Sequence, residues 1–168
     1  MVKLTKIYTR TGDEGMTGLS DFSRTRKTDP RIEAYADVDE ANSAIGVAVA
    51  LAKNEFDAET LALLSQIQNE LFDLGADLSN PLNEHYEYEP LRVNNLWIDA
   101  LEAAIDKYNG QLTKLDSFII PGGTGLSAGL HLARTVVRRA ERATWHAIEA
   151  YRSEEHTSEL QSLRHISY

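Results

Sequence analysis

The chain has 168 residues, of which 42% are hydrophobic and 26% are charged. This size and composition fit one globular domain and exclude a chain that is disordered throughout. The formal net charge of −9 argues against a nucleic-acid partner, because binding to a phosphate backbone requires a dominant positive field.

Cysteine is absent from the chain, which excludes disulfides, cysteine-based zinc sites and thiol nucleophiles and fits a reducing compartment. The longest apolar runs are too short to cross a membrane. The N-terminus MVKLTKIYTRTGDEG also lacks the apolar stretch of a signal peptide. We therefore expect a cytoplasmic location and no membrane partner.

The first thirty residues have no helical periodicity. The segment from Lys6 to Thr9 is predicted to be a short extended piece, and the loop TRTGDEGMTG follows from Thr9 to Gly18. Glycines let backbone N–H groups approach an anion, and threonine hydroxyls bind phosphate oxygens or a metal. The loop matches neither the Walker A pattern nor G-x-G-x-x-G, and an ordinary surface turn is the alternative interpretation.

Four amphipathic helices are predicted where apolar residues recur at spacings of three and four. Their ranges are Asp37 to Lys53, Asp57 to Leu78, about Asn95 to Gly110 and about Leu126 to Ala150. Asp57 is the expected N-cap of the second helix, and the tolerance of glycine for positive φ suits Gly110 to the end of the third. Because such stripes can only bury one another, the fold class is predicted to be all-α, an up-and-down helical bundle.

Charged residues concentrate on the first and the fourth helix. Asp37, Asp39, Glu40 and Asn42 crowd the expected first turn of the first helix, where acidic groups complement the helix dipole. Whether one of them reaches an arginine is left open. On the fourth helix, Arg134, Arg138 and Arg142 share one face with Glu141 beside them, which indicates either an anion site or a solvated surface of Arg/Glu pairs.

Two further patterns carry no function. The segment Gly125 to Gly129 matches G-x-S-x-G, but no Asp follows Ser127, the strands of an α/β-hydrolase are missing, and Ser127 is expected in the first turn of a helix. A serine hydrolase is therefore rejected. The histidines at positions 85, 131 and 146 are too scattered for a metal motif.

Three blocks of the sequence together resemble a known family. They are KIYTRTGDEGMTGL near the start, RIEAYADVDEANSAIG on the first helix and FIIPGGTGLSAGLHLARTVVRRAER before and on the fourth. In this order they resemble the signature blocks of the PduO-type corrinoid adenosyltransferases, over a stretch from Lys6 to about Ala150.

The resemblance implies a ferritin-like helical bundle that assembles as a homotrimer, with ATP in a cleft between neighbouring subunits. It also implies the reaction: the Co(I) of a bound cob(I)alamin attacks the ribose C5′ of ATP and expels triphosphate, which yields adenosylcobalamin. Mg²⁺ would share the neutralisation of the phosphate charge, and a cobalamin reductase is a possible further partner.

The same resemblance assigns roles to individual residues. Asp39 would form an intersubunit salt bridge to Arg138, and Phe118 would crowd the lower face of the corrinoid and disfavour its axial ligand. No protein ligand for a metal is assigned. The ATP-binding residues would be Thr9, Arg10, Thr11, Gly12, Thr17, Gly18, Lys27, Arg138, Glu141 and Arg142.

The chain departs from the family pattern in two places. Ala36 and Ala41 stand where many relatives have Gly and Leu, and the last helix of the family, with its NRLSD-like block, is missing. Instead the chain ends in RSEEHTSELQSLRHISY, whose first part resembles the translation of a DNA-sequencing adapter. We therefore expect residues 1–151 to form the enzyme domain and residues 152–168 to be a non-native tail, with a natural polar tail as the alternative.

Two alternatives to an adenosyltransferase follow from the same residues. A non-catalytic ATP-binding or sensor bundle would keep the Thr/Gly loop and the arginines but turn nothing over. A purely structural helical module would not respond to ATP at all.

Overall fold

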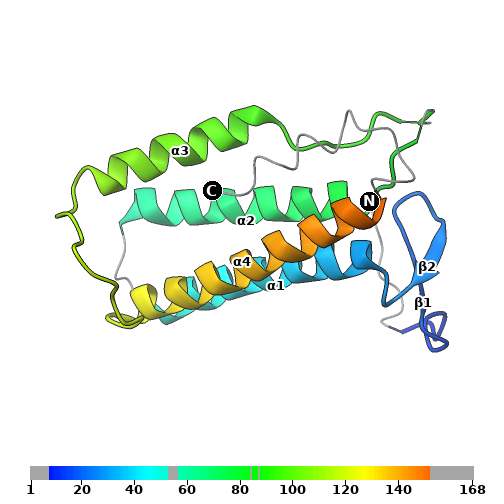
Figure 1. The fold of residues 1–168 in the computed structure, drawn as a ribbon, viewed down its shortest axis with the longest axis horizontal. Helices are drawn as coiled ribbons and strands as arrows, with labels where there is room; N and C mark the ends of the chain where they lie inside the picture. Colours follow the sequence, from blue (N-terminus) through cyan, green and yellow to red (C-terminus); the bar gives the residue numbers. More distant parts are fainter. Residues whose placement is uncertain (1–7, 53–56, 84, 87, 152–168) are drawn as a thin grey trace.

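The computed structural model describes residues 8–52, 57–83, 85–86 and 88–151. In chain order its elements are β1 (Met16–Gly18), β2 (Arg24–Arg26), α1 (Pro30–Leu51), α2 (Ala58–Leu78), α3 (Asn95–Asn109) and α4 (Gly125–Tyr151). The long helices run roughly parallel or antiparallel to one another along the longest axis of the molecule (Figure 1). The all-α fold class and the four predicted helices are thus confirmed. The proposed foreign tail lies outside the described residues.

The first helix begins seven residues earlier than the apolar stripe predicts. Asp29 caps it, with a side-chain oxygen that accepts a hydrogen bond from the Arg31 N–H at 2.8 Å, and Pro30 occupies the first turn. Proline suits this position because its fixed φ is helical and its missing N–H is not needed. Asp37 and Glu40 therefore lie inside α1, and the prediction that they complement the helix dipole is wrong.

The other helix ends follow the local signals in the sequence. Asp57 caps α2 by accepting from the Thr60 N–H at 2.7 Å, as predicted. Asn94 caps α3 by accepting from the Leu96 N–H at 3.0 Å. Helix α3 ends before Gly110, but this glycine has a φ of −61°, so the expected left-handed conformation is wrong there.

The core is centred on α1, which packs along α4 on one side and along α2 on the other. Half of the buried residues of α1 are alanines, and Ala34, Ala41 and Ala48 are fully covered. Gly129 of α4 lies so close to Ala48 that a Cβ atom on the glycine would come within 2.6 Å of the Ala48 Cα. Small residues at these positions therefore set the close approach of α1 and α4.

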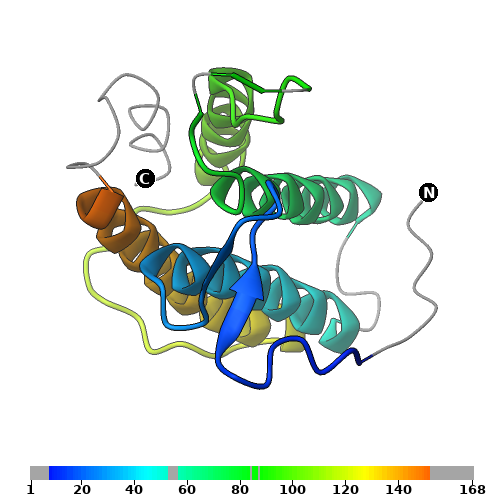
Figure 2. The same cartoon turned by 90° about the vertical axis from the view of Figure 1, so that its right-hand side faces the viewer.

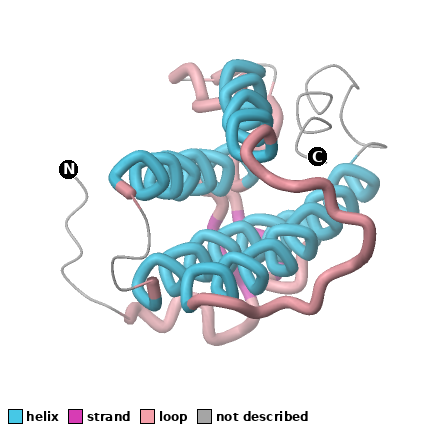
Figure 3. Tube along the Cα trace, turned by 90° about the vertical axis from the view of Figure 1, so that its left-hand side faces the viewer, coloured by secondary structure: helices cyan, strands magenta, loops and turns pink. Residues whose placement is uncertain are grey.

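Helix α3 stands apart from this core, and none of its residues is buried. Within the described ranges, its polar contacts with α2 are an ion pair between Lys107 and Glu59 and a 3.0 Å hydrogen bond between the hydroxyls of Tyr108 and Thr60. Figure 3 shows α3 away from α4, with the long loop that joins them running around the end of the molecule. The prediction that all four stripes bury one another fails for α3, whose Ile105 is 58% exposed.

A β-hairpin that the sequence did not predict precedes the helices. Strands β1 and β2 are antiparallel, with Thr17 opposite Thr25 and Gly18 opposite Arg24. The hairpin lies at the end of the bundle where α1 begins and α4 ends (Figure 2). Of the predicted extended piece, Tyr8 and Thr9 are irregular, and the preceding residues lie outside the described ranges.

Candidate functional site

The loop before β1 folds back onto the residue after β2. The backbone N–H of Lys27 donates to the Gly15 carbonyl at 2.9 Å. A Cβ atom on Gly12 would lie only 3.1 Å from both the Cε and the Nζ of Lys27. A glycine at position 12 therefore lets the lysine ammonium group lie directly over the loop backbone, which is an arrangement suited to an anion.

Thr9, Arg10 and Thr11 of this loop are exposed, and Thr17 is half-buried. The hydroxyls of Thr9 and Thr11 are hydrogen-bonded at 2.9 Å, and the guanidinium of Arg24 donates to the Thr11 carbonyl at 2.8 Å. Arg10 has a φ of 62° and lies over the ring of Tyr8 at 5.9 Å. The structure thus brings seven residues of the predicted ATP site together in one hairpin and its loop: Thr9, Arg10, Thr11, Gly12, Thr17, Gly18 and Lys27.

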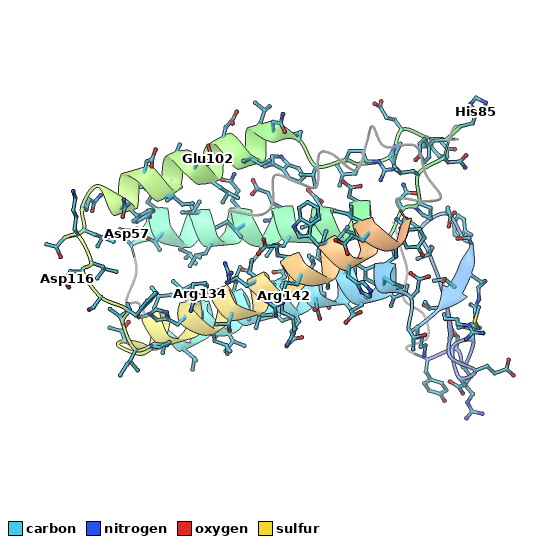
Figure 4. The ribbon with its side chains drawn as sticks, viewed as in Figure 1. Asp57, His85, Glu102, Asp116, Arg134 and Arg142 are labelled. Carbon is cyan, nitrogen blue, oxygen red and sulfur yellow. The ribbon has the colours of Figure 1, made fainter. Side chains whose placement is uncertain are left out.

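The arginines of α4 divide between two faces of the helix. Arg138 and Arg142 are exposed, and the Arg142 side chain donates to the Arg138 carbonyl at 2.9 Å. Figure 4 labels Arg134 and Arg142, which lie two turns apart along α4. Neither Arg138 nor Arg142 forms an ion pair with an acidic residue of the described ranges, so their charges face solvent.

Arg139, the neighbour of Arg138, faces α1 instead. Its guanidinium lies 3.3 Å from a carboxylate oxygen of Asp37 and also pairs with Glu40. This answers the question that the sequence left open, because acidic residues of α1 do reach an arginine. The pairs of Arg139 leave Arg138 and Arg142 available to an anion, and their binding of one stays a prediction.

Asp39 lies on another side of α1. It lines a cavity of about 430 Å³ between α1, α2 and the hairpin, together with Gly18, Tyr35, Asn42 and Phe72. Among the described residues it forms no ion pair with an arginine. The predicted bridge between Asp39 and Arg138 is therefore not made within one chain.

Phe118 lies in the loop that joins α3 to α4, and its side chain is fully exposed, as is that of Ile120. Asp116, two residues earlier, is labelled in Figure 4 at the end of the molecule opposite the hairpin. Within one chain, the predicted corrinoid contact, Phe118, is therefore separated from the predicted phosphate contacts of the hairpin by most of the length of the bundle.

Comparison with known proteins identifies the fold and the family. Residues 7–167 match the sequence model of the family described as Cobalamin adenosyltransferase. The chain belongs to the cobalamin adenosyltransferase family.

Corrinoid adenosyltransferases of other bacteria are similar to the chain over most of its length. It is 58% identical over 150 residues to the corrinoid adenosyltransferase of Mycobacterium tuberculosis, which is 89% of this chain and 77% of that protein. It is 41% identical over 164 residues to the Bacillus subtilis corrinoid adenosyltransferase, which is 96% of this chain and 81% of that protein.

A solved structure agrees with these relatives. It holds a variant of the PduO-type ATP:corrinoid adenosyltransferase from Lactobacillus reuteri complexed with cobalamin and ATP. It aligns with a TM-score of 0.77 and 36% identity, over 96% of this chain and 84% of that chain.

The sequence missed a polar cluster that supports the hairpin of this cobalamin adenosyltransferase. Asp29 accepts hydrogen bonds from the Thr25 hydroxyl at 2.6 Å and from the Tyr151 hydroxyl, which lies 2.8 Å from each carboxylate oxygen. Burial alone would raise the pKa of Asp29, but the bonds from Thr25, Tyr151 and Arg31 outweigh it and hold the pKa below its usual value. In the sequence, Asp29 followed by Pro30 is the signal that could have predicted the start of α1.

A second polar cluster joins the end of α2 to the following loop. The buried carboxylate of Asp77 accepts from the Arg92 guanidinium at 2.6 Å and from the Val93 N–H at 2.8 Å. Burial would lower the pKa of Arg92, but the bond and the charge of Asp77 outweigh it and raise the pKa. Arg92 also donates to the Tyr86 hydroxyl at 2.8 Å.

The patterns rejected from the sequence also have no catalytic geometry. Ser127 lies in the first turn of α4, as predicted, and its hydroxyl donates to the Gly122 carbonyl at 2.8 Å. Within the described ranges, no three His, Asp or Glu side chains gather closely enough to hold a metal ion. None of the described helices is long and apolar enough to cross a membrane.

Proposed function

We infer that the chain is an ATP:cob(I)alamin adenosyltransferase, which transfers the 5′-deoxyadenosyl group of ATP to cob(I)alamin and releases triphosphate. The observation that carries this inference is the hairpin with Lys27 over Gly12 in a chain that aligns with an ATP- and cobalamin-bound family structure. In the reaction the Co(I) electron pair forms the Co–C5′ bond, and the C5′–O5′ pair leaves with the triphosphate.

The protein contributes charge and position rather than a nucleophile. Lys27, Arg10 and the threonine hydroxyls around them would bind the triphosphate, whose negative charge grows as the C5′–O5′ bond breaks. Mg²⁺ would enter with ATP and take most of its ligands from the phosphates, as this ion usually does.

Arg138, Glu141 and Arg142 would complete the ATP site, and Phe118 would contact the corrinoid. The Lactobacillus reuteri structures support two of these assignments through the variants they contain. A phenylalanine at position 112 of that protein and an arginine at position 132 were replaced, and Phe118 and Arg138 of this chain are likewise twenty positions apart.

We propose a homotrimer with sites between subunits, and the separation of these groups within one chain supports it. Arg138 is thirteen residues before Tyr151, which contacts Asp29 beside the hairpin. Thirteen helical residues span about 20 Å, and Phe118 lies still further away. A neighbouring subunit can bring arginines to the hairpin and can place an arginine against Asp39, which this chain leaves without such a partner among its described residues.

We also propose a cytoplasmic location and a cobalamin reductase as a partner, because the Co(I) state requires a reducing compartment and an electron donor. The assignment of residues 1–151 to the domain and 152–168 to a non-native tail stays a prediction. The family match extends to residue 167, which weighs against it. Amplifying the locus from source DNA tests it, because a genuine RSEEHTSELQS codon run would contradict a foreign tail.

The decisive experiment is anaerobic incubation of the chain with ATP and chemically reduced cobalamin. Adenosylcobalamin and triphosphate should form in equal amounts, and Lys27→Ala should lose most of this activity. Lys107→Ala is the matched control, because it removes one lysine charge near the end of α3, and α3 ends on the side of the molecule opposite the hairpin (Figure 1). ATP binding without product would indicate a non-catalytic bundle, and no thermal shift with ATP would indicate a structural module.

A further inference from the structure

We propose that Asp29 and Tyr151 are positioning residues for ATP. Tyr151 at the end of α4 contacts Asp29, and Asp29 in turn contacts the strand that leads to Lys27. This strand is thereby held at a fixed place on the bundle. The inference rests on the proposed function, because it assigns a role within the same site.

The carboxylate of Asp29 does more than a helix cap requires. One oxygen accepts from the Arg31 N–H at 2.8 Å, which is the capping bond. The other accepts from the Thr25 hydroxyl at 2.6 Å, and the Tyr151 hydroxyl lies 2.8 Å from both. A single side-chain oxygen is sufficient to cap a helix. The second oxygen therefore joins three elements, β2, α1 and α4, at one point.

The cap of α2 provides a comparison within the same chain. Asp57 has the same residue type at the same position, and its carboxylate accepts from the Thr60 N–H at 2.7 Å. Among the described residues it has no bond to another element. Capping alone thus explains Asp57 but does not explain the contacts of Asp29 with Thr25 and Tyr151.

These contacts act on the part of the hairpin that faces ATP. Thr25 is paired with Thr17 across the hairpin, and Lys27 lies between Thr25 and Asp29 in sequence. Fixing Thr25 and Asp29 therefore holds the backbone on both sides of Lys27, whose ammonium group lies over Gly12. A group that binds phosphate loses less conformational entropy when its backbone is already fixed.

Tyr151 makes the bundle end of this link rigid. The Arg31 guanidinium lies 4.5 Å from the centre of the Tyr151 ring, and it donates to the Leu78 carbonyl at the end of α2 at 3.1 Å. The hairpin has a second contact with α2, because the Ser20 N–H donates to the Ser79 carbonyl at 3.1 Å. The hairpin is therefore held at its turn by α2 and at its base by α1 and α4.

Steady-state kinetics of Asp29→Asn and Tyr151→Phe test the inference. Asparagine still caps a helix well, and phenylalanine keeps the ring under Arg31, so both variants should fold. Each should raise the KM for ATP about fivefold, the effect of losing one hydrogen bond. The kcat at saturating ATP and the KM for cob(I)alamin should stay within about twofold of wild type. Asp57→Asn, the matched control, should change none of these constants.

Two variants of Thr25 test whether the hydrogen bond to Asp29, rather than the size of the side chain, sets the KM for ATP. Thr25→Ser keeps the hydroxyl that bonds Asp29 and should keep the KM for ATP, whereas Thr25→Val removes the hydroxyl at similar size and should raise it. If the Asp29, Tyr151 and Thr25→Val variants all match wild type in the KM for ATP, the inference is wrong although the enzyme is active. A wild-type chain that forms no adenosylcobalamin overturns the proposed function and this inference with it.

Discussion

At the scale of single residues, two adjacent arginines of α4 have different surroundings. Arg139 pairs with Asp37 and Glu40 of α1, whereas Arg138 has no acidic partner among the described residues. We predict that Arg138→Ala lowers kcat/KM by about 100-fold, because a cation that stabilises the leaving triphosphate is lost. Arg139→Ala should lower the free energy of unfolding by less than about 1 kcal/mol, as for other exposed ion pairs.

The comparison is made by measuring both activity and urea denaturation of the two variants. The loss of activity in Arg138→Ala should exceed that in Arg139→Ala at least about tenfold, while Arg139→Ala should be the less stable variant. Equal losses of activity would contradict the prediction that Arg138, and not Arg139, acts on the triphosphate.

The bond between Asp29 and Tyr151 should make stability depend on pH at both ends of the range. The pKa of Asp29 is lowered from 3.8, so its contribution is complete above that value and is lost as the pH falls through the lower folded-state pKa. Burial, with the Asp29 bond and charge, raises the pKa of Tyr151 from 10.0. The contribution of Tyr151 is therefore complete below pH 10.0 and is lost as the pH rises above it.

Urea denaturation as a function of pH measures this effect. The stability difference between wild type and Asp29→Asn should shrink below about pH 4, and that between wild type and Tyr151→Phe should shrink above about pH 10. A difference that is constant from pH 3 to pH 11 would show that the ionisation of Asp29 and Tyr151 is not linked to folding.

The sequence indicated the loop residues proposed to bind phosphate, but not the residues that hold the hairpin in place. Thr9 to Gly18 are contiguous, so their clustering is visible in the sequence itself. Asp29 and Tyr151 are 122 positions apart, and no local pattern connects them. The same limit applies to Asp77 and Arg92, whose pairing depends on the path of the loop after α2.

At the scale of elements, the contact between α1 and α4 depends on Gly129. A Cβ atom there would lie 2.6 Å from the Cα and 2.7 Å from the Cβ of Ala48, so the helices would have to separate. We predict that Gly129→Ala lowers the free energy of unfolding by about 1–3 kcal/mol, although alanine has the higher helix propensity. Thermal or urea denaturation measures the change.

Gly75 in α2 is the matched control for that substitution. A Cβ atom on Gly75 would have no neighbour within 4 Å, so Gly75→Ala gains helix propensity without a clash. It should raise the free energy of unfolding by up to about 1 kcal/mol. If both variants are more stable than wild type, the space between α1 and α4 can accept a Cβ atom at position 129, and the prediction is wrong.

Helical periodicity predicted all four helices because each spans several turns. It placed the start of α1 too late because the first turns carry Arg31 and Tyr35 rather than a continuous aliphatic stripe. Strands β1 and β2 have three residues each and are rich in polar side chains. A segment that short has no measurable period of two, so its pairing cannot be recognised from the pattern alone.

At the scale of the whole molecule, the proposed site is divided along the bundle. The hairpin lies where α1 begins, Arg134 and Arg142 lie along α4, and Asp116, two residues before Phe118, lies at the other end (Figures 1 and 4). The sequence gives the order of these groups but not their distances, so only the fold shows that one chain does not bring them together. An assembly in which neighbours share each site accounts for this separation.

Complementation between inactive variants tests this division directly. Lys27→Ala should remove the phosphate contact of the hairpin, and Arg138→Ala should remove a phosphate contact of α4. Each variant alone should therefore be nearly inactive. When the two are co-expressed, a site between subunits can take its hairpin from one variant and its arginines from the other. Random assembly from equal amounts leaves both parts intact in about a quarter of the sites, and about a quarter of wild-type activity should return.

Co-expression of Lys27→Ala with Lys27→Ala,Arg138→Ala provides the control, because no site in that mixture has an intact hairpin. Activity in the first mixture and none in the control would locate the hairpin and the arginines of one site on different subunits. If neither mixture is active while size measurements confirm mixed oligomers, both groups serve the same ATP from one chain. The fold would then have to close by about 20 Å along α4, the length of helix between Arg138 and the hairpin end of the bundle.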